Sequence, residues 1–423
     1  MLVPEAPLDA YRSDLARNKS REDFGGADTI WLLTAHCLSR LGRASVEDVE
    51  LLGTQCANAL RDFTDPSSGG ASLTDAEVSD LRLVVEGLSA VRERAGADAL
   101  AQGIRGMAAR MTEAGALSMA YTTVDLTRRV GHRATDRERG ILTADQAMVA
   151  RLLGDLEAAE DLYRAVEAIG DRSGDFIVLA RAYIGRGVLD RVRGNYPRSR
   201  IYFERGLELA ESVDARDLMR HAHQGLTICH AIARNFDRAL QHGWTTYTLS
   251  TSDGGEIEAL SNLAQLSLDA GYPGAALRGF AAVLGRTVSA RVSLGALGGI
   301  ATAAAHTRDL AILARAEAEV ESRVITSALP YENAQALYHL ATAYAIAGDS
   351  EKSEAFRTRA RKLAQARGFF EIVHKTDGEA VAKAAAPLSD SASLSKPSKD
   401  VLTSISDLDV GEAAAVLALT RQP

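Results

Sequence analysis

The stretch RGNYPRSRIYFERGLELA, residues 193–210, decides the fold. Gly194 interrupts one helical pattern, and a second begins at Tyr196, in which Ser199 and Phe203 follow at helical spacing. A glycine between two helical stretches is typical of a helix end, because a residue without a Cβ adopts the left-handed conformation at little cost. The stretch therefore predicts a hairpin of two helices that turns near Gly194.

The same pattern recurs through the chain at intervals of 37 to 40 residues. The copies turn near residues 115, 154, 194, 234, 271, 308 and 348. Because one hairpin of this size buries too little surface to be stable alone, such a period indicates a solenoid of stacked hairpins. A small residue follows most turns by five positions and a larger one by nine. We expect such residues to be buried between the two helices of their units, at Ala159, Ala276, Phe203 and Phe280.

This pattern resembles the tetratricopeptide repeat over roughly residues 101–370. The residues of the opening unit that stand at that family's spacing are Gly187, Gly194, Tyr196 and Phe203. Ser199 and Gly206 stand where the family prefers Ala, and the interval exceeds the standard repeat of about 34 residues. Lengthened repeats of this kind resemble those of bacterial regulators and peptide-pheromone receptors. The resemblance implies an all-α fold, a right-handed α-solenoid of stacked helical hairpins.

Composition and charge fit a helical protein. Hydrophobic residues make up 46% of the 423 residues but aromatic residues only 5%, which favours helices over an all-β fold. A formal net charge of -8 gives no reason to expect nucleic acid as a partner. The N-terminus lacks the pattern of a secretory signal, and no apolar run reaches about 18 residues. We therefore expect a cytoplasmic protein that does not span a membrane.

Three parts are expected along the chain. Residues 1–72 are expected to form an N-terminal helical cap, with amphipathic helices at 27–42 and 45–63. Residues 73–370 are expected to form the repeat solenoid, which begins with a helix over 73–96.

The third part, residues 371–423, is expected to be a mobile polar tail. A Ser-rich linker begins at Pro387, and a short helix is expected around 409–420, either free or docked. The segment 404–410 carries Asp407 and Asp409, which makes it a candidate acidic ligand for a neighbouring copy.

Motifs for catalysis, metals and cofactors are missing from the sequence. The pair Gly-Lys of a phosphate loop never occurs, GRGVLD at 185–190 lacks the third glycine of a dinucleotide fingerprint, and no Gly-x-Ser-x-Gly elbow occurs. His221, His223 and His230 lack the i,i+4 spacing of two ligands on one helix, so we expect ordinary packing there. The cysteines have no CxxC spacing. We therefore expect no cofactor and no metal site, while the N-terminal helices leave a helix-turn-helix as an alternative.

The resemblance also implies a binding groove along the first helix of each unit, lined by its second, fifth, ninth and twelfth positions. The residues at these positions that carry the site prediction are Arg105, Arg151, Arg181, Arg191, His221, Gln224, Gln265 and Tyr338. Four arginines in one half of the groove favour an acidic or carboxylate-bearing peptide, held by forked guanidinium contacts. The alternative is that arginine is common in this chain and falls there by chance.

Three classes of function follow from these observations. The leading hypothesis is a non-catalytic adaptor or scaffold that binds a protein or peptide segment in its groove. The alternative is a peptide-sensing regulator related to bacterial repeat regulators. A further alternative is an enzyme with its site in the groove. The sequence names neither the partner nor the oligomeric state.

Overall fold

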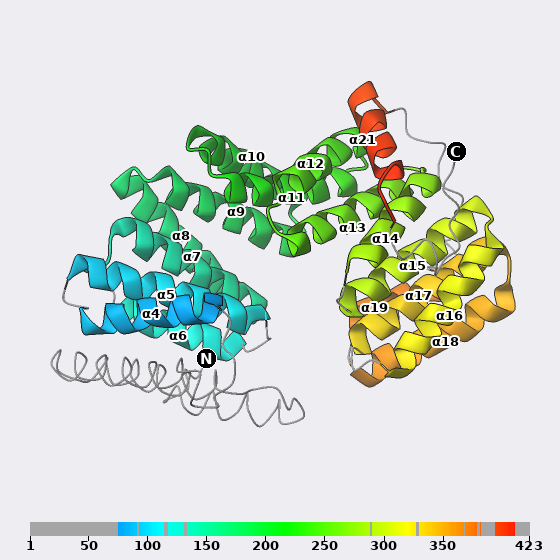
Figure 1. Ribbon diagram of the computed structural model, residues 1–423, viewed down its shortest axis with the longest axis horizontal. Helices are drawn as coiled ribbons and strands as arrows, with labels where there is room; N and C mark the ends of the chain where they lie inside the picture. Colours follow the sequence, from blue (N-terminus) through cyan, green and yellow to red (C-terminus); the bar gives the residue numbers. More distant parts are fainter. Residues whose placement is uncertain are drawn as a thin grey trace. The chain divides into compact units, whose positions relative to one another are not determined.

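The computed structural model describes residues 75–90, 93–113, 117–130, 133–287, 290–326, 330–367, 369–378, 381 and 394–410. Within these ranges every regular element is a helix (Figure 1). The helices form successive hairpins. The first helices of these hairpins are, in chain order, α5 (Arg94–Glu113), α7 (Asp136–Leu152), α9 (Phe176–Val192), α11 (Arg216–Ile232), α13 (Asp253–Asp269), α15 (Ala290–Thr307) and α17 (Pro330–Ala347). Their second helices are, in the same order, α6 (Leu117–Val130), α8 (Leu156–Ser173), α10 (Tyr196–Ser212), α12 (Phe236–Leu249), α14 (Pro273–Arg286), α16 (Leu310–Thr326) and α18 (Ser350–Arg367).

The helices stack in two compact units, residues 1–218 and 219–423. In the first unit α4 (Asp75–Ser89) packs on α5, and α5 packs on α7 as α7 does on α9. In the second unit α13, α15 and α17 pack in the same successive way. Second helices such as α8 and α14 pack on the first helices at both of their sides, α7 and α9 for α8 and α13 and α15 for α14, so these hairpins complete their cores with a neighbour. The predicted all-α solenoid of stacked hairpins is confirmed.

The turns between paired helices lie where the repeat pattern predicts them. The residues that adopt a positive φ there are Gly154 (85°), Gly194 (78°), Arg234 (56°), Gly271 (88°), Arg308 (60°) and Gly348 (84°). The remaining predicted turn, at residue 115, lies outside the described residues. After each turn a backbone N–H closes the first helix; Asn195 N, for example, donates to Asp190 O at 2.8 Å.

The residue after the turn begins the second helix. In most hairpins it is Asp or Asn, whose side chain accepts a hydrogen bond from the backbone N–H three residues on. Asp155 accepts from Ala158 N at 3.0 Å, and Asp349 accepts from Lys352 N at 3.0 Å. The turning residue and its successor therefore stop one helix and start the next.

Packing inside the hairpins confirms the predicted core. Ala159, Ala276 and Phe203 are fully buried, and Phe280 is only 3% exposed. Phe203 lies so close to the first helix that a Cβ on Gly187 would stand 2.9 Å from its ring.

A serine stands five residues after the turn in two hairpins, where Ala159 and Ala276 stand in others. Ser199 Oγ donates to Gly187 O at 2.8 Å, and Ser353 Oγ donates to Ala341 O at 2.8 Å. Both serines are buried, and each hydroxyl finds its acceptor on the partner helix of its own hairpin. A small hydroxyl side chain therefore fits this position as well as Ala does.

The predicted extent of the helix over 73–96 is wrong. The chain turns between α4, which ends at Ser89, and α5, which begins at Arg94. Small residues let the two helices pack closely after this turn: a Cβ on Gly87 would lie 2.4 Å from Leu100 N, and one on Gly96 would lie 2.1 Å from Ala90 O. The expected helices at 27–42 and 45–63 lie outside the described residues.

Two short helices follow α18 in the described part of the tail. They are α19 (Phe370–Lys375) and α21 (Lys396–Ser406). Of the two alternatives for the final segment, residues 394–410 are docked, because α21 packs on α12 and α14. Helix α21 ends before residue 409, where the sequence predicts a helix to begin, and residues 411–423 lie outside the described part. Across the described helices, none combines the length and the apolar character that a membrane crossing needs.

Candidate functional site

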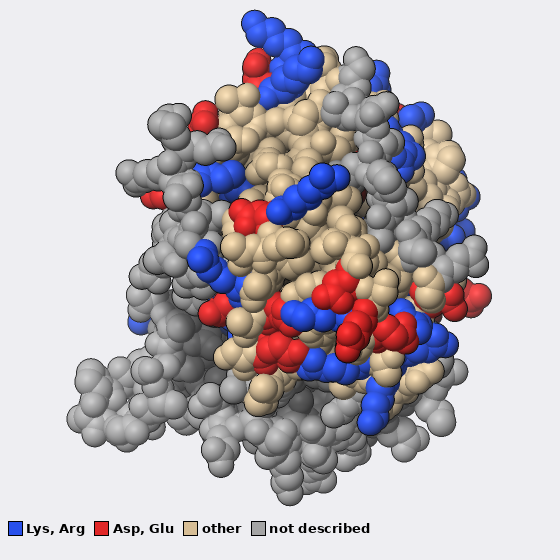
Figure 2. All heavy atoms as spheres, turned by 90° about the vertical axis from the view of Figure 1, so that its right-hand side faces the viewer, with Lys and Arg blue, Asp and Glu red and all other residues tan. Residues whose placement is uncertain are grey.

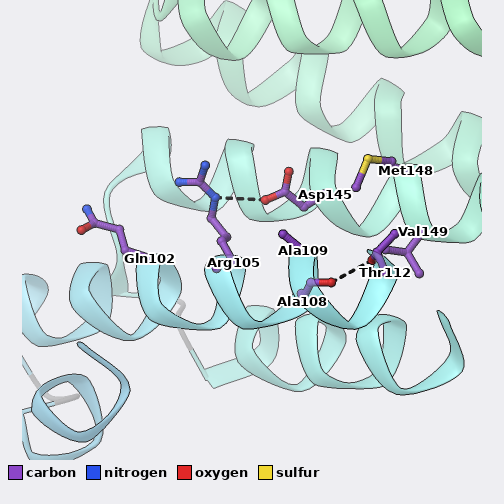
Figure 3. A pocket seen from close by; sticks show the side chains of 9 residues that line it. Gln102, Arg105, Ala108, Ala109, Thr112, Asp145, Met148 and Val149 are labelled. Carbon is purple, nitrogen blue, oxygen red and sulfur yellow. Dashed lines mark hydrogen bonds and ion pairs between the residues drawn. The ribbon is translucent and has the colours of Figure 1, made fainter. Parts of the chain in front are cut away.

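The first helices of the N-terminal unit bring charged side chains together around Asp145. Arg105 on α5 donates from Nε to Asp145 Oδ2 on α7 at 3.0 Å (Figure 3), and from Nη1 to Glu138 Oε2 at 3.3 Å. Gln102 Nε2 donates to Glu138 Oε1 at 3.1 Å. From α9, Arg181 Nη1 lies 3.7 Å from Asp145 Oδ1. We call these five residues the Asp145 cluster.

The repeat itself positions the Asp145 cluster. Arg105 and Asp145 are 40 residues apart, about one repeat, so they stand at nearly the same height on neighbouring first helices. Arg181 belongs to the next first helix and approaches Asp145 from its other side. One carboxylate thus lies between two guanidinium groups from adjacent repeats.

Arg181 is the least satisfied member of the cluster. Its Nε is buried and has no hydrogen-bond partner among the described residues, and its one ion pair, to Asp145, is long at 3.7 Å. Burial lowers the pKa of Arg181, against the opposing effect of Asp145, and Arg105 lowers the pKa further. Asp217 and Glu138 raise the pKa of Arg181, as Asp145 does, but by less. The guanidinium therefore retains hydrogen-bonding capacity that the described residues do not use.

Arg151 joins the same region through a buried tyrosine on α8. Burial raises the pKa of Tyr163 to about 12, and Arg151 and Arg181 both oppose that rise through their positive charge. Arg151 Nε is also buried without a partner in the part of the chain that the structure describes. Three of the four predicted arginines thus lie in one region of the first-helix face.

A hollow of about 330 Å³ adjoins the cluster between α5 and α7. Its lining residues are Gln102, Arg105, Gly106, Ala108, Ala109, Thr112, Asp145, Met148 and Val149. Figure 3 shows Arg105 and Asp145 toward one end and Met148 and Thr112 toward the other. The hollow therefore offers charge at one end and small or apolar side chains at the other.

The other predicted groove residues are not gathered at this cluster. Arg191 lies half-buried in the last turn of α9, outside the Asp145 cluster. In the C-terminal unit, Gln224 Nε2 donates to Glu258 Oε1 at 3.0 Å and Gln265 Nε2 donates to Asp269 Oδ1 at 2.9 Å.

The two aromatic groove candidates also contact their sequence neighbours. His221 Nε2 lies 2.7 Å from Arg220 Nη2, and the ring of Tyr338 lies 5.5 Å from that of His339. His221, Gln224, Gln265 and Tyr338 thus belong to the second unit and contact residues of that unit.

Sequence reasoning missed the acidic half of the Asp145 cluster. Asp145 and Glu138 lie outside the four groove positions of their unit, although the 40-residue spacing from Arg105 to Asp145 could have indicated the pair. Gln102 occupies the second position of its unit, so the same rule could have found it.

Three histidines of the second unit pack together between α11 and α12. His223 Nδ1 lies 2.8 Å from His242 Nδ1, and the ring of His230 stacks on that of His242 with centroids 5.4 Å apart. Burial is the main cause that lowers the pKa of His242 to about 4, and the positive charges of His223, His230 and Arg238 contribute to the same shift. Within the described residues no group of three or more His, Cys, Asp or Glu side chains has the arrangement of a metal site.

Charged side chains also pair across α16 and α18. Lys352 Nζ lies 2.8 Å from Glu317 Oε2, and Arg359 pairs with Glu321. Figure 2 shows basic and acidic side chains interleaved on the face of the molecule turned to the viewer. Among the described residues, this face therefore carries charges of both signs.

Comparisons with known proteins bear on the fold. No family model and no curated protein matches the sequence. A signal-transduction ATPase with a tetratricopeptide repeat sensor from Pyrococcus horikoshii is 12% identical with a TM-score of 0.50, over 79% of this chain and 56% of that chain. This chain thus spans little more than half the length of that protein.

Two further solved structures superpose less closely. A Rap protein complexed with competence and sporulation factor is 9% identical with a TM-score of 0.47, over 82% of this chain and 99% of that chain. The quorum sensor NprR from B. thuringiensis is 12% identical with a TM-score of 0.43, over 75% and 99%. At such low identity the similarity concerns the fold alone, which is that of tetratricopeptide-like helical repeats.

Proposed function

We propose that the chain is a non-catalytic scaffold that binds an extended acidic protein or peptide segment along the face of α5, α7 and α9. The observation that carries this proposal is the state of Arg181, whose buried Nε lacks a partner among the described residues and whose ion pair to Asp145 is 3.7 Å long. A buried donor without an acceptor costs free energy, and a carboxylate is the acceptor that a guanidinium binds best.

The hollow beside the cluster supports a peptide as the ligand. A carboxylate bound at Arg181 and Arg105 leaves the neighbouring side chain of the same segment facing the wall formed by Ala109 and Met148. Such a ligand would satisfy the guanidinium groups and cover apolar surface at the same time.

The chemistry of the cluster favours binding over catalysis. Asp145 and Glu138 already accept hydrogen bonds from Arg105, so their carboxylates serve as anchors for guanidinium groups. A peptide-sensing regulator remains the second candidate, and it differs from a scaffold in changing conformation when the ligand binds.

The test begins with an array of 12-residue peptides that alternate Asp or Glu with apolar residues, each with an Asn or Gln counterpart. The tightest acidic peptide is then titrated by fluorescence anisotropy against the full chain and against Arg181→Gln. This substitution removes the positive charge of residue 181 but leaves Asp145 paired with Arg105.

Loss of a hydrogen bond to a charged group, about 1.5–3 kcal/mol, should weaken binding by roughly 10- to 100-fold. The matched control is Arg200→Gln, which removes an exposed arginine from α10 whose partner is Glu204 at 3.5 Å. The control should bind as the wild type does. Equal affinity of Arg181→Gln and the wild type, or no preference for the acidic peptides over their amides, would refute the proposal.

A further inference from the structure

The C-terminal segment 394–410 is seated on the second helices of the C-terminal unit as an amphipathic helix. The helix α21 lies beside α12 and α14, and Figure 1 shows it in red next to them. Val401, Leu402 and Ile405 are buried against these helices, whereas Lys399 and Thr403 on the other face are exposed. The apolar side chains therefore form one stripe, at the spacing of a helix laid in a groove.

The first turn of α21 is held by polar contacts to α12. Ser395 N donates to Asp237 Oδ1 at 2.8 Å, and Ser398 Oγ donates to Asp237 O at 3.0 Å. Gln241 Nε2 donates to Ser398 Oγ at 3.3 Å and to Asp237 Oδ2 at 3.1 Å. The side chain of Ser395 forms no capping hydrogen bond at the start of α21. Asp237 of α12 instead accepts a hydrogen bond from the backbone at this helix end.

The last turn of α21 is held by Arg278 on α14. Arg278 donates from Nε to Ser406 O and from Nη2 to Leu408 O, each at 3.2 Å. A guanidinium at the C-terminal end of a helix satisfies carbonyl groups that have no partner inside the helix and complements its dipole. The two ends of the seated helix are therefore recognised by side chains of opposite charge, Asp237 and Arg278.

The surface of α14 is shaped for this helix. A Cβ on Gly279 would lie 2.9 Å from Ala264 Cβ and 3.1 Å from Ile405 Cγ2, so the absence of a side chain there lets both α13 and α21 approach α14 closely. The same hydrophobic cluster includes Leu240 of α12 and Ala275 of α14. We call this surface, from Asp237 to Arg278, the α12–α14 groove.

A helix of 11 residues is marginal in water on its own, so α21 depends on the groove for its stability. Its attachment rests on a few buried side chains and on hydrogen bonds at its two ends. These are the contacts of a helix-in-groove complex, in which the groove recognises an apolar stripe and the two helix ends.

We propose that the α12–α14 groove is a docking site for an amphipathic helix of a partner protein, and that residues 394–410 are its built-in occupant. The partner helix has a serine-rich first turn, apolar residues at the positions of Val401, Leu402 and Ile405, and a C-terminal turn that Arg278 caps. The tail competes with this partner from within the same chain, where its effective concentration is high. This site lies on second helices and is separate from the Asp145 cluster.

The test uses the full chain with Val401→Asp and Ile405→Asp, which places two charges on the buried stripe and releases the tail. The probe is a fluorescent peptide of residues 394–410, LSKPSKDVLTSISDLDV. The released variant should bind this peptide at least tenfold more tightly than the wild type, because the millimolar effective concentration of the attached tail blocks the wild-type groove. Adding Arg278→Ala should weaken the peptide's binding roughly tenfold through the loss of two hydrogen bonds.

Thr403→Asp is the matched control, since it adds a charge to the exposed face of the same helix. It should bind the peptide no better than the wild type does. Equal binding by the released variant and the wild type, or a failure of both to bind, would overturn the proposal. Loss of the cooperative melting transition in the released variant would also overturn it, because the tail would then be part of the core. A wild-type dimer that exchanges labelled tails would assign the groove to a second copy instead.

Discussion

Phe203→Ala tests whether the hairpin of α9 and α10 is held together by the aromatic residue at its centre. The side chain of Phe203 is 0% exposed, and its ring faces Gly187 on the partner helix at a distance that leaves no room for a Cβ. Ser199 joins the two helices by a hydrogen bond to Gly187 O, and closing the space left by the ring would disturb this bond. Truncation should therefore leave a cavity and cost about 3–5 kcal/mol of unfolding free energy.

A second phenylalanine in the same hairpin supplies the control. Phe176 at the start of α9 is 45% exposed, so Phe176→Ala should cost only about 1 kcal/mol. The assay is urea unfolding followed by circular dichroism, with the slope of each transition compared to detect separate unfolding of the two units. If Phe203→Ala costs no more than Phe176→Ala, the assigned phase of the repeat is wrong.

Further predictions concern turns and pH. Gly194→Ala should destabilise the chain by about 1 kcal/mol although no atom lies within 4 Å of the added Cβ, because the positive φ is strained for alanine. Arg308→Gly should relieve such strain, and a lower urea midpoint for it than for the wild type would contradict this account. The pKa of His242 lies at about 4 against an ordinary value of 6.5, so the unfolded chain binds more protons between these values. Stability should be full above pH 6.5 and fall toward pH 4; a urea midpoint unchanged between pH 7 and pH 4.5 would contradict it.

Periodic features of this fold could be predicted from the sequence. The residue type itself predicts the turns at Gly154, Gly194 and Gly271. The turns at Arg234 and Arg308 are predicted only by their position in the repeat. Their positive φ shows that the phase of the helices, and not the glycine, sets the turn.

Contacts between repeats and with the tail could not be predicted in the same way. The spacing from Arg105 to Asp145 is about one repeat, but the contact of Arg181 with Asp145 depends on how α9 packs beside α7, which the period of the sequence does not specify. Ser395 meets Asp237 across 158 residues, with no pattern in the sequence that links them. Such non-local pairs depend on tertiary packing, so they appear only once the helices are placed.

Hydrogen–deuterium exchange of the full chain, with and without a saturating acidic peptide, tests the central claim most directly. Amide exchange reports local opening, and a bound ligand slows it where the ligand stabilises the structure. The account predicts added protection centred on α5, α7 and α9, around Arg105, Asp145 and Arg181. If the peptide binds but these three helices gain no protection, the account is contradicted.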